Sequence, residues 1–291
     1  MKSHLVSICI PTYNGEKYLE KALNSVNNQI YQNIEVIISD DASNDNTLEI
    51  CEKFRNRANF PVHIFHHKPC GIGANWNNCI EKSNGEFIKF LFQDDLLEPE
   101  CVETMLSYLL KFEVDIVICK RKIIAEDFDS EFHKNWMKKY GDLQQGINLD
   151  FFDFYNFSKA DLNLVGSKYE LSYNFIGEPI TSLFKKELFK DVGEFSYEMK
   201  QLLDLEYWLR ILKSKSLGIL NQELVSFRIH NQQTSSVNSR AKVDESEIIE
   251  KILFNKFFSF LNPKQRKILL YKKYPILKKM MMFLYKMKIK K

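Results

Sequence analysis

The chain has 291 residues, of which 45% are hydrophobic and 27% are charged, as in an ordinary globular protein of one large or two small domains. No apolar run reaches the roughly 18 to 20 residues that a membrane-spanning helix needs, and Met1–His4 leads straight into a strand-like run without a signal peptide. The formal net charge of +3 is unevenly distributed, because residues 264–291 hold 11 of the 41 Lys and Arg residues and no Asp or Glu. We therefore expect a cytoplasmic protein with a mildly acidic body and a basic tail.

Strand-like and helix-like stretches alternate over the first 120 residues. Buried-strand patterns occur at 5–10, 34–39, 62–65, 87–92 and 114–119, and helical patterns at about 16–29, 47–56, 75–82 and 99–112. This alternation predicts βαβ units and an α/β fold, a Rossmann-like, mainly parallel sheet flanked by helices.

The second half is less regular before order returns. Residues 124–177 mix aromatic residues with Lys and Asp, which fits either an acceptor-binding lid or a packed irregular region. Patterned sequence resumes at Glu178–Phe184, a helix is predicted at 202–212, and a strand-like run at 218–227 ends just before Arg228 and His230.

Polar clusters follow three of the predicted strands: Thr12–Asn14, Asp40–Asp41 and Asp94–Asp95. The carboxyl ends of parallel strands meet at one edge of a sheet, where ligands bind in open α/β folds. Paired carboxylates there suit Mg²⁺ or Mn²⁺ beside phosphate oxygens, whereas one isolated pair is more often a solvated turn that caps the next helix. The repetition after three strands favours a binding site.

The chemistry of these clusters suits a nucleoside diphosphate. Tyr13 offers a ring for a base to stack on, and a neighbouring carboxylate accepts hydrogen bonds from a base or ribose. Neither a GxxxxGK[ST] loop nor a GxGxxG loop is present, which disfavours a P-loop ATPase and a dinucleotide-binding enzyme. The six cysteines form no CxxC pair, so we expect small buried core residues rather than disulfides or zinc ligands.

Several stretches together resemble inverting glycosyltransferase family 2, which has the GT-A fold and includes enzymes of bacterial surface-polysaccharide synthesis. They are residues 6–14, 39–43, 85–88 and 93–95 and the helix that carries Asp204, and the resemblance runs from about residue 5 to 230. It implies a GT-A domain over 1–240, with a nucleotide-binding half (1–123), an acceptor-side half (124–240) and a helical, basic C-terminal extension (241–291).

The resemblance also implies roles for individual residues. Pro11, Thr12, Tyr13, Asn14 and Asp40 would bind the nucleoside of the donor, with Asp41 as a weaker candidate, and Asp94 would face the donor sugar or ribose. Asp95 would hold Mn²⁺ or Mg²⁺. Asp204 would be the general base, with Glu206 as a rival, and His230 would bind metal or face a phosphate unless it is structural.

Three positions depart from the family pattern. Gln93 stands where the DXD motif begins with a carboxylate, and Leu203 precedes the base where the family often has Glu. Trp76 replaces a common Arg, which puts a phosphate contact in doubt and makes Trp76 a core aromatic residue by expectation.

The resemblance implies transfer of a sugar from a UDP-, GDP- or dTDP-sugar to a saccharide or lipid-linked saccharide. A sugar-nucleotide nucleotidyltransferase and a catalytically decayed nucleotide- or carbohydrate-binding protein are the alternatives.

Basic and apolar residues mix in the tail, after a predicted helix at 243–261, and this pattern favours a membrane-surface helix. A solvated terminus is the alternative, and no nucleic-acid-binding motif accompanies the charge. The protein would then lie peripherally on the inner face of the plasma membrane.

Overall fold

The computed structural model describes residues 3–125, 130–144, 152–168, 170–280 and 282. The chain divides into two compact units, one formed by Met1–Ser158 with Phe175–Val243 and the other by Lys159–Asn174 with Asp244–Lys291. The first unit contains every predicted site residue.

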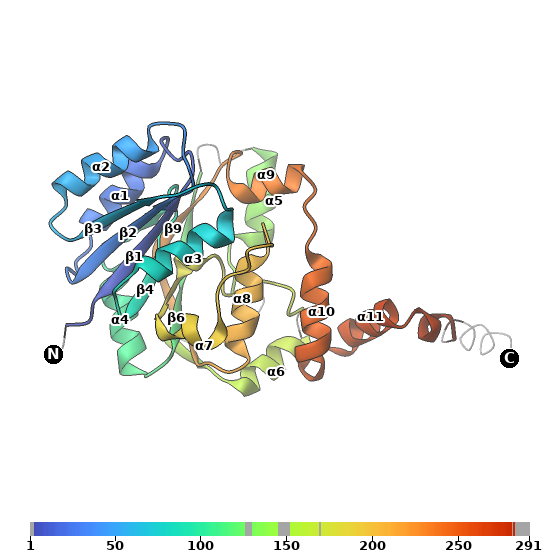
Figure 1. Cartoon of the computed structure of the whole chain (residues 1–291). Helices are drawn as coiled ribbons and strands as arrows, with labels where there is room; N and C mark the ends of the chain where they lie inside the picture. Colours follow the sequence, from blue (N-terminus) through green and yellow to red (C-terminus); the bar gives the residue numbers. More distant parts are fainter. Residues whose placement is uncertain (1–2, 126–129, 145–151, 169, 281, 283–291) are drawn as a thin grey trace. The chain divides into compact units, whose positions relative to one another are not determined.

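Four parallel strands form the first half of the sheet in the order β3-β2-β1-β4 (Figure 1). They are β1 (Val6–Thr12), β2 (Ile34–Asp40), β3 (Val62–His66) and β4 (Phe87–Phe90). Every residue of β1 and β2 is buried, which explains why these stretches are apolar on both faces. The predicted α/β order of this half is confirmed, and β4 ends two residues earlier than its apolar run.

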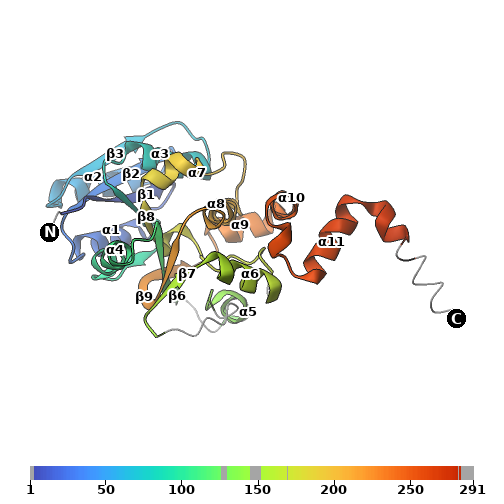
Figure 2. The same ribbon diagram turned by 90° about the horizontal axis from the view of Figure 1, so that it is seen from below.

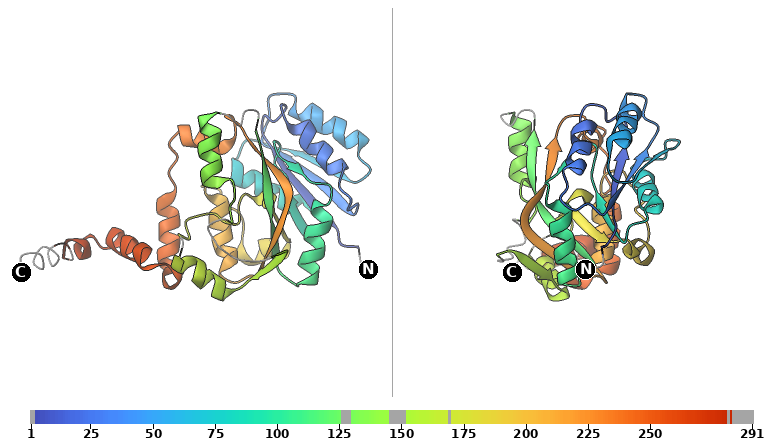
Figure 3. Two further views of the ribbon diagram at one scale, coloured as in Figure 1. Left: turned by 180° about the vertical axis from the view of Figure 1, so that it is seen from behind. Right: turned by 90° about the vertical axis from the view of Figure 1, so that its left-hand side faces the viewer.

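The second half of the sheet mixes parallel and antiparallel pairs, whereas β1–β4 are all parallel, as predicted. Strand β8 (Ser182–Lys185) lies antiparallel between β4 and β6 (Ile116–Ala125). Strand β6 runs parallel to β9 (Leu217–Ile229), as Figure 3 shows, and β5 (Leu96–Leu97) and β7 (Phe154–Phe157) pair antiparallel with β9. Strand β8, which is distant from β4 in the sequence, lies beside β4. The strand predicted at 114–119, which is β6, therefore does not pair with β4.

Helices cover both faces of this sheet (Figure 2). On one face α1 (Leu19–Asn27), α2 (Thr47–Arg57) and α4 (Cys101–Lys111) share a hydrophobic core with the strands. On the other face lie α3 (Ile72–Lys82), α7 (Glu187–Val192) and α8 (Leu203–Leu212). Trp76 is buried there against Phe90 and Phe195, and Phe195 stacks on Tyr207 at 4.0 Å, so Trp76 is the core aromatic residue expected.

The rest of the first unit comprises α5 (Glu131–Tyr140), the 3₁₀ turn η1 (Pro179–Thr181) and α9 (Thr234–Arg240). The second unit comprises α6 (Lys159–Lys168), α10 (Ser246–Lys256), the 3₁₀ turn η2 (Phe258–Phe260) and α11 (Pro263–Lys273). Helix α6 packs on η2 so closely that a Cβ at Gly166 would lie 2.2 Å from the Phe260 carbonyl oxygen. A segment of the predicted acceptor-side half therefore groups with the C-terminal extension.

No helix in the described part of the chain is both long and apolar enough to cross a membrane. Residues 283–291 of the predicted basic tail lie outside the described residues.

Candidate functional site

The loops that follow β1, β2 and β4 are joined by hydrogen bonds at one edge of the sheet. The Asp41 backbone N–H donates to the Thr12 carbonyl oxygen at 2.9 Å. The Gln93 side-chain amide accepts from the Tyr13 N–H at 2.9 Å and donates to the Tyr13 carbonyl at 3.0 Å. The three polar clusters predicted to meet therefore do meet.

Asp40 is fully buried and its carboxylate is saturated by donors from the protein. It accepts hydrogen bonds from Thr12 Oγ1 (2.8 Å), from the Ser43 N–H (2.9 Å) and hydroxyl (2.5 Å), and pairs with His66 Nδ1 (2.9 Å). Burial alone would raise the pKa of Asp40, but these donors outweigh it and lower that pKa. Asp40 therefore anchors the loop, with no face open to a nucleoside.

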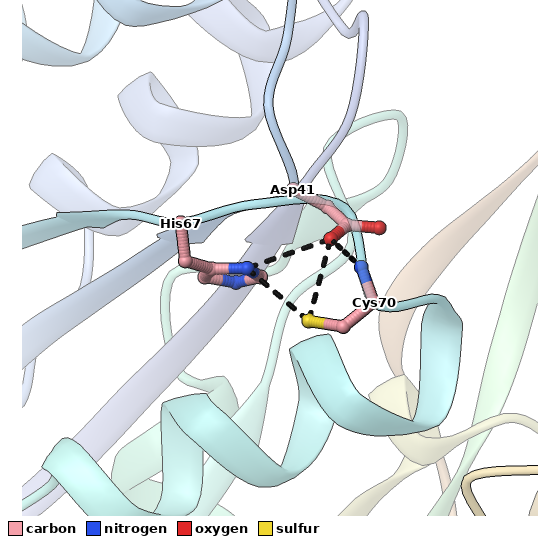
Figure 4. A group of neighbouring side chains, drawn as sticks. All are labelled: Asp41, His67 and Cys70. Carbon is pink, nitrogen blue, oxygen red and sulfur yellow. Dashed lines mark hydrogen bonds and ion pairs between the residues drawn. The ribbon is translucent and has the colours of Figure 1, made fainter.

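Asp41 points away from Asp40 toward the start of α3. Its carboxylate accepts from the backbone N–H groups of Cys70 (2.8 Å) and Gly71 (3.2 Å) and lies 3.5 Å from His67 Nδ1. Figure 4 shows the contacts of Asp41 with Cys70 and His67. Its side chain retains 13% exposure. Of the two carboxylates after β2, Asp41 is the accessible one.

The loop after β1 presents one aromatic ring to solvent. Pro11 and Thr12 are buried at the end of β1, whereas the Tyr13 side chain is 54% exposed. Asn14 adopts a left-handed backbone (φ 47°), and its side-chain oxygen accepts from the Asn44 N–H at 2.8 Å. Gly15 packs closely on Gln93, because a Cβ at Gly15 would lie 2.3 Å from Gln93 Oε1 and would push that side chain away. Gln93 thus holds the Tyr13 loop in place.

Asp95 is buried with an unsatisfied carboxylate. Its Oδ1 accepts from the Arg228 backbone N–H at 2.8 Å, and its Oδ2 has no hydrogen-bond partner among the described residues. Burial, and then the charge of Asp94, raise the pKa of Asp95 well above its ordinary value. An oxygen that is both buried and unpartnered is suited to a cation.

Asp94 and His230 meet beside Asp95. Asp94 Oδ2 lies 2.8 Å from His230 Nε2, and the Asp94 carbonyl accepts from Arg228 Nε at 2.8 Å. The other ring nitrogen of His230 is buried without a partner among the described residues. Strand β9, which ends at Ile229, thus brings His230 to the acidic pair.

Asp204 lies in the first turn of α8 and accepts a hydrogen bond from the Leu205 N–H at 2.7 Å. Burial, and then the charge of Glu178, raise the pKa of Asp204 to about 7, close to the value that suits a general base at neutral pH. Its rival Glu206 pairs with Arg210 at 2.9 Å on the same helix, and Leu203 is buried.

Sequence reasoning missed an ion pair between Arg121 and Glu178. Arg121 is buried against the stacked rings of Trp136 and Phe227, whose centroids lie 5.3 and 4.7 Å from its guanidinium carbon. Glu178 raises, and Arg121 lowers, the pKa of both Asp95 and Asp204. The pair therefore links the acidic cluster to the predicted base. Two charged residues inside the β6 strand pattern, Lys120 and Arg121, were its only sequence signal.

The residues after β4 fit a divalent cation. The carboxylate oxygens of Asp94 and Asp95 and the imidazole of His230 are ligands that Mn²⁺ or Mg²⁺ can bind. Asp95 Oδ2, which has no hydrogen-bond partner among the described residues, is the buried carboxylate oxygen that such an ion would neutralise.

The family model described as glycosyl transferase family 2 matches residues 7–190. The chain is 36% identical over 145 residues to the abequosyltransferase RfbV of Salmonella typhimurium, covering 48% of this chain and 43% of RfbV.

Two solved structures have the same fold. One is Staphylococcus aureus TarS in complex with UDP-GlcNAc, with a TM-score of 0.64 and 20% identity over 92% of this chain and 70% of that one. The other is the mannosyltransferase PcManGT of Pyrobaculum calidifontis in complex with GDP-Man and Mn²⁺, with a TM-score of 0.55 and 14% identity over 92% of this chain and 68% of that one. At these identities the likeness concerns the fold.

Proposed function

Because the chain belongs to glycosyl transferase family 2, whose members use nucleotide sugars, we propose that it transfers a sugar to an acceptor hydroxyl with inversion, in cell-surface polysaccharide synthesis. One observation carries the proposal. Asp95, which is buried, and Asp204, a base with a pKa of about 7, share the same charged neighbours, Glu178 and Arg121. An acidic cation site beside a poised base is what transfer from a nucleoside diphosphate requires.

The donor nucleoside is assigned to the loops after β1 and β2. The exposed ring of Tyr13 can stack on a base, and the accessible carboxylate of Asp41 can accept from a base N–H or ribose hydroxyl. This reverses the predicted ranking of Asp40 over Asp41, because Asp40 is closed by four internal contacts.

Asp204 is assigned as the general base. Its carboxylate takes the proton of the acceptor hydroxyl while that oxygen forms a bond to the anomeric carbon. The bond from the anomeric carbon to the phosphate oxygen breaks, and the nucleoside diphosphate leaves with the electron pair. Attack opposite the leaving group inverts the anomeric configuration. Asp204 suits this role because its raised pKa makes the carboxylate basic enough to accept the proton at neutral pH.

Mn²⁺ or Mg²⁺ would be held by Asp95, with Asp94 and His230 beside it. When bound, the ion would neutralise negative charge on the departing diphosphate. The protein's own contribution is to keep Asp95 Oδ2 buried, with no hydrogen-bond donor to it among the residues that the structure describes.

Gln93 argues against the decayed-protein alternative. Its amide forms two hydrogen bonds to Tyr13, so the lost carboxylate of the DXD pattern has been replaced by a support for the donor loop. That replacement leaves Asp95 as the principal metal-binding carboxylate.

The test of donor binding is the thermal shift of the protein with UDP-, GDP- and dTDP-sugars, each with and without Mn²⁺. We expect one of the three nucleotide sugars to raise the melting temperature of the protein, and Mn²⁺ to increase that rise. Indifference to all three nucleotides would overturn the proposed function.

We assign a membrane surface as partner of the tail. Around residue 276 exposed apolar side chains alternate with exposed lysines: Ile276, Leu277, Met280 and Met282 with Lys278 and Lys279. Basic and apolar groups together bind anionic lipid surfaces. In a flotation assay with vesicles that contain anionic lipid, the full chain should be recovered with the vesicles, and a chain that lacks residues 264–291 should not. Equal recovery of both proteins would contradict this assignment.

A further inference from the structure

One cluster of metal-ligating side chains lies outside the predicted cation site. Asp41 follows β2, His67 follows β3, and Cys70 precedes α3, and Figure 4 shows the three side chains directed at one another. Cys70 is exposed, whereas the other five cysteines are buried, so the expectation that all six cysteines are core residues is wrong for Cys70. The turn before α3 carries it outside the core.

The three ligand atoms are spaced as around a tetrahedral ion. His67 Nδ1 lies 3.3 Å from Cys70 Sγ and 3.5 Å from Asp41 Oδ1, and Sγ lies 3.7 Å from that oxygen. Zinc bonds of about 2.0 to 2.3 Å place tetrahedral ligand atoms roughly 3.3 to 3.6 Å apart. We propose that Asp41, His67 and Cys70 form a second metal site, selective for Zn²⁺ and similar thiophilic ions.

The surroundings hold two of the ligands in position. The Asp41 carboxylate is fixed by the N–H groups of Cys70 and Gly71. The far nitrogen of His67, Nε2, lies 3.0 Å from Ser39 Oγ and 3.2 Å from Asn75 Oδ1. Metal-bound histidines are commonly oriented by such a contact on the opposite ring nitrogen.

Metal binding replaces one contact of the metal-free protein and releases one proton. His67 Nδ1 gives up its 2.9 Å contact with the Lys68 carbonyl oxygen. The Cys70 thiol loses its proton to solvent, because the thiolate is the form that binds a metal. A thiolate, an imidazole and one carboxylate suit Zn²⁺, whereas Mg²⁺ prefers oxygen ligands alone.

The site also bears on donor binding, a consequence that rests on the proposed function. A metal bound here occupies Asp41 Oδ1, the carboxylate assigned to the nucleoside. Zn²⁺ and the nucleotide would therefore compete.

Zinc titration of the full chain in excess Mg²⁺, which fills oxygen-rich sites, tests the proposal. We expect one tightly bound Zn²⁺, and a loss of affinity of at least roughly tenfold in Cys70→Ser and in His67→Gln. His63→Gln is the matched control, because His63 is a half-exposed histidine of β3 outside the cluster, and it should bind Zn²⁺ as the wild type does. Equal affinity of wild type and Cys70→Ser would overturn the site.

A second measurement needs no variant. Cys70 is the one exposed thiol, so a thiol reagent should modify one cysteine of the native protein, and Zn²⁺ should slow that reaction at least tenfold. An unchanged rate at saturating Zn²⁺ would contradict the proposal. Nucleotide affinity measured with and without Zn²⁺ then separates the two assignments. Zinc binding that leaves nucleotide affinity unchanged removes Asp41 from the donor site and keeps the metal site.

Discussion

Two Asp–Asp pairs lie at the carboxyl ends of β2 and β4, the strands on either side of β1, and the structure gives them opposite electrostatics. Asp40 and Asp95 are each the buried member of their pair. Asp40 receives donors on both oxygens and has a lowered pKa, whereas Asp95 receives one backbone donor on one oxygen and has a raised pKa. The number of internal donors, rather than burial, decides which carboxylate is stable as an anion and which one needs a cation.

The two pairs therefore have different roles: Asp40 anchors its loop, whereas Asp95 belongs to the region that we assign to catalysis. Around Asp40 the protein itself supplies hydrogen-bond donors to both carboxylate oxygens, whereas its neighbour Asp41 keeps part of its side chain exposed. Around Asp95 the protein leaves charge uncompensated, and Asp94, His230 and the Arg121–Glu178 pair gather beside it. Asp204 belongs to this second region, because it has the same charged neighbours and a raised pKa.

The largest effect is expected at Asp204. Asp204→Asn should lower kcat by about 10² to 10⁴-fold, the usual contribution of a general base, and leave nucleotide affinity unchanged. Steady-state kinetics with nucleotide titration measure both. Glu206→Gln is the matched control on the same helix, and it should stay within tenfold of wild type because Glu206 is paired with Arg210. Near-normal turnover in Asp204→Asn would place the base elsewhere.

Asp40→Asn should destabilise the fold by about 1 to 3 kcal/mol at pH 7, because buried donors lose their acceptor. Since the pKa of Asp40 is lowered in the folded state, this stabilisation is present above the ordinary value of 3.8 and is lost as the pH falls through the folded pKa. In urea unfolding, the difference in free energy of unfolding between Asp40→Asn and the wild type should be smaller at pH 3 than at pH 7. Asp191→Asn, at an exposed carboxylate, is the control and should change stability little. A fully stable Asp40→Asn would show that the donors around Asp40 do not hold the loop.

Tyr13→Ala should weaken nucleotide binding by roughly tenfold, because stacking of a base on an aromatic ring contributes about 1 to 3 kcal/mol. Calorimetric titration with the nucleoside diphosphate measures this loss. Tyr197→Ala, at another exposed tyrosine, is the control. If both variants bind nucleotide as the wild type does, the base is not held by the β1 loop.

The smallest effect concerns the pH profile. Since Asp204 must be deprotonated to act, kcat/KM should rise with pH, be half-maximal near pH 7 and level off at higher pH. Glu178→Gln removes a charge that raises this pKa, so the acidic limb should move to lower pH, by about one pH unit or less. An unchanged limb would mean that Glu178 does not tune the base.

The first half of the fold could be predicted from the sequence, because β1 and β2 are apolar on both faces and regular helices separate the strands. The second half could not. Strand β8 has four residues and lies between strands that are distant from it in sequence, so no local pattern indicates its position.

The candidate site could also be predicted only in part from the sequence. The clusters after β1, β2 and β4 were predictable because parallel strands bring their carboxyl ends together. The ranking of Asp40 against Asp41 was not, because it depends on donors from Ser43 and His66. The Arg121–Glu178 pair joins residues 57 positions apart, and no motif links them.

The Mn²⁺ affinities of wild type, Asp95→Asn and Asp40→Asn test the contrast between the two aspartate pairs most directly. We predict that Asp95→Asn loses at least roughly tenfold in affinity while its melting temperature at pH 7 does not fall, because an uncompensated buried charge is removed. Asp40→Asn, studied at a temperature where it is folded, should bind Mn²⁺ as the wild type does. Equal Mn²⁺ affinity in wild type and Asp95→Asn would contradict the assignment of Asp95 as the cation site.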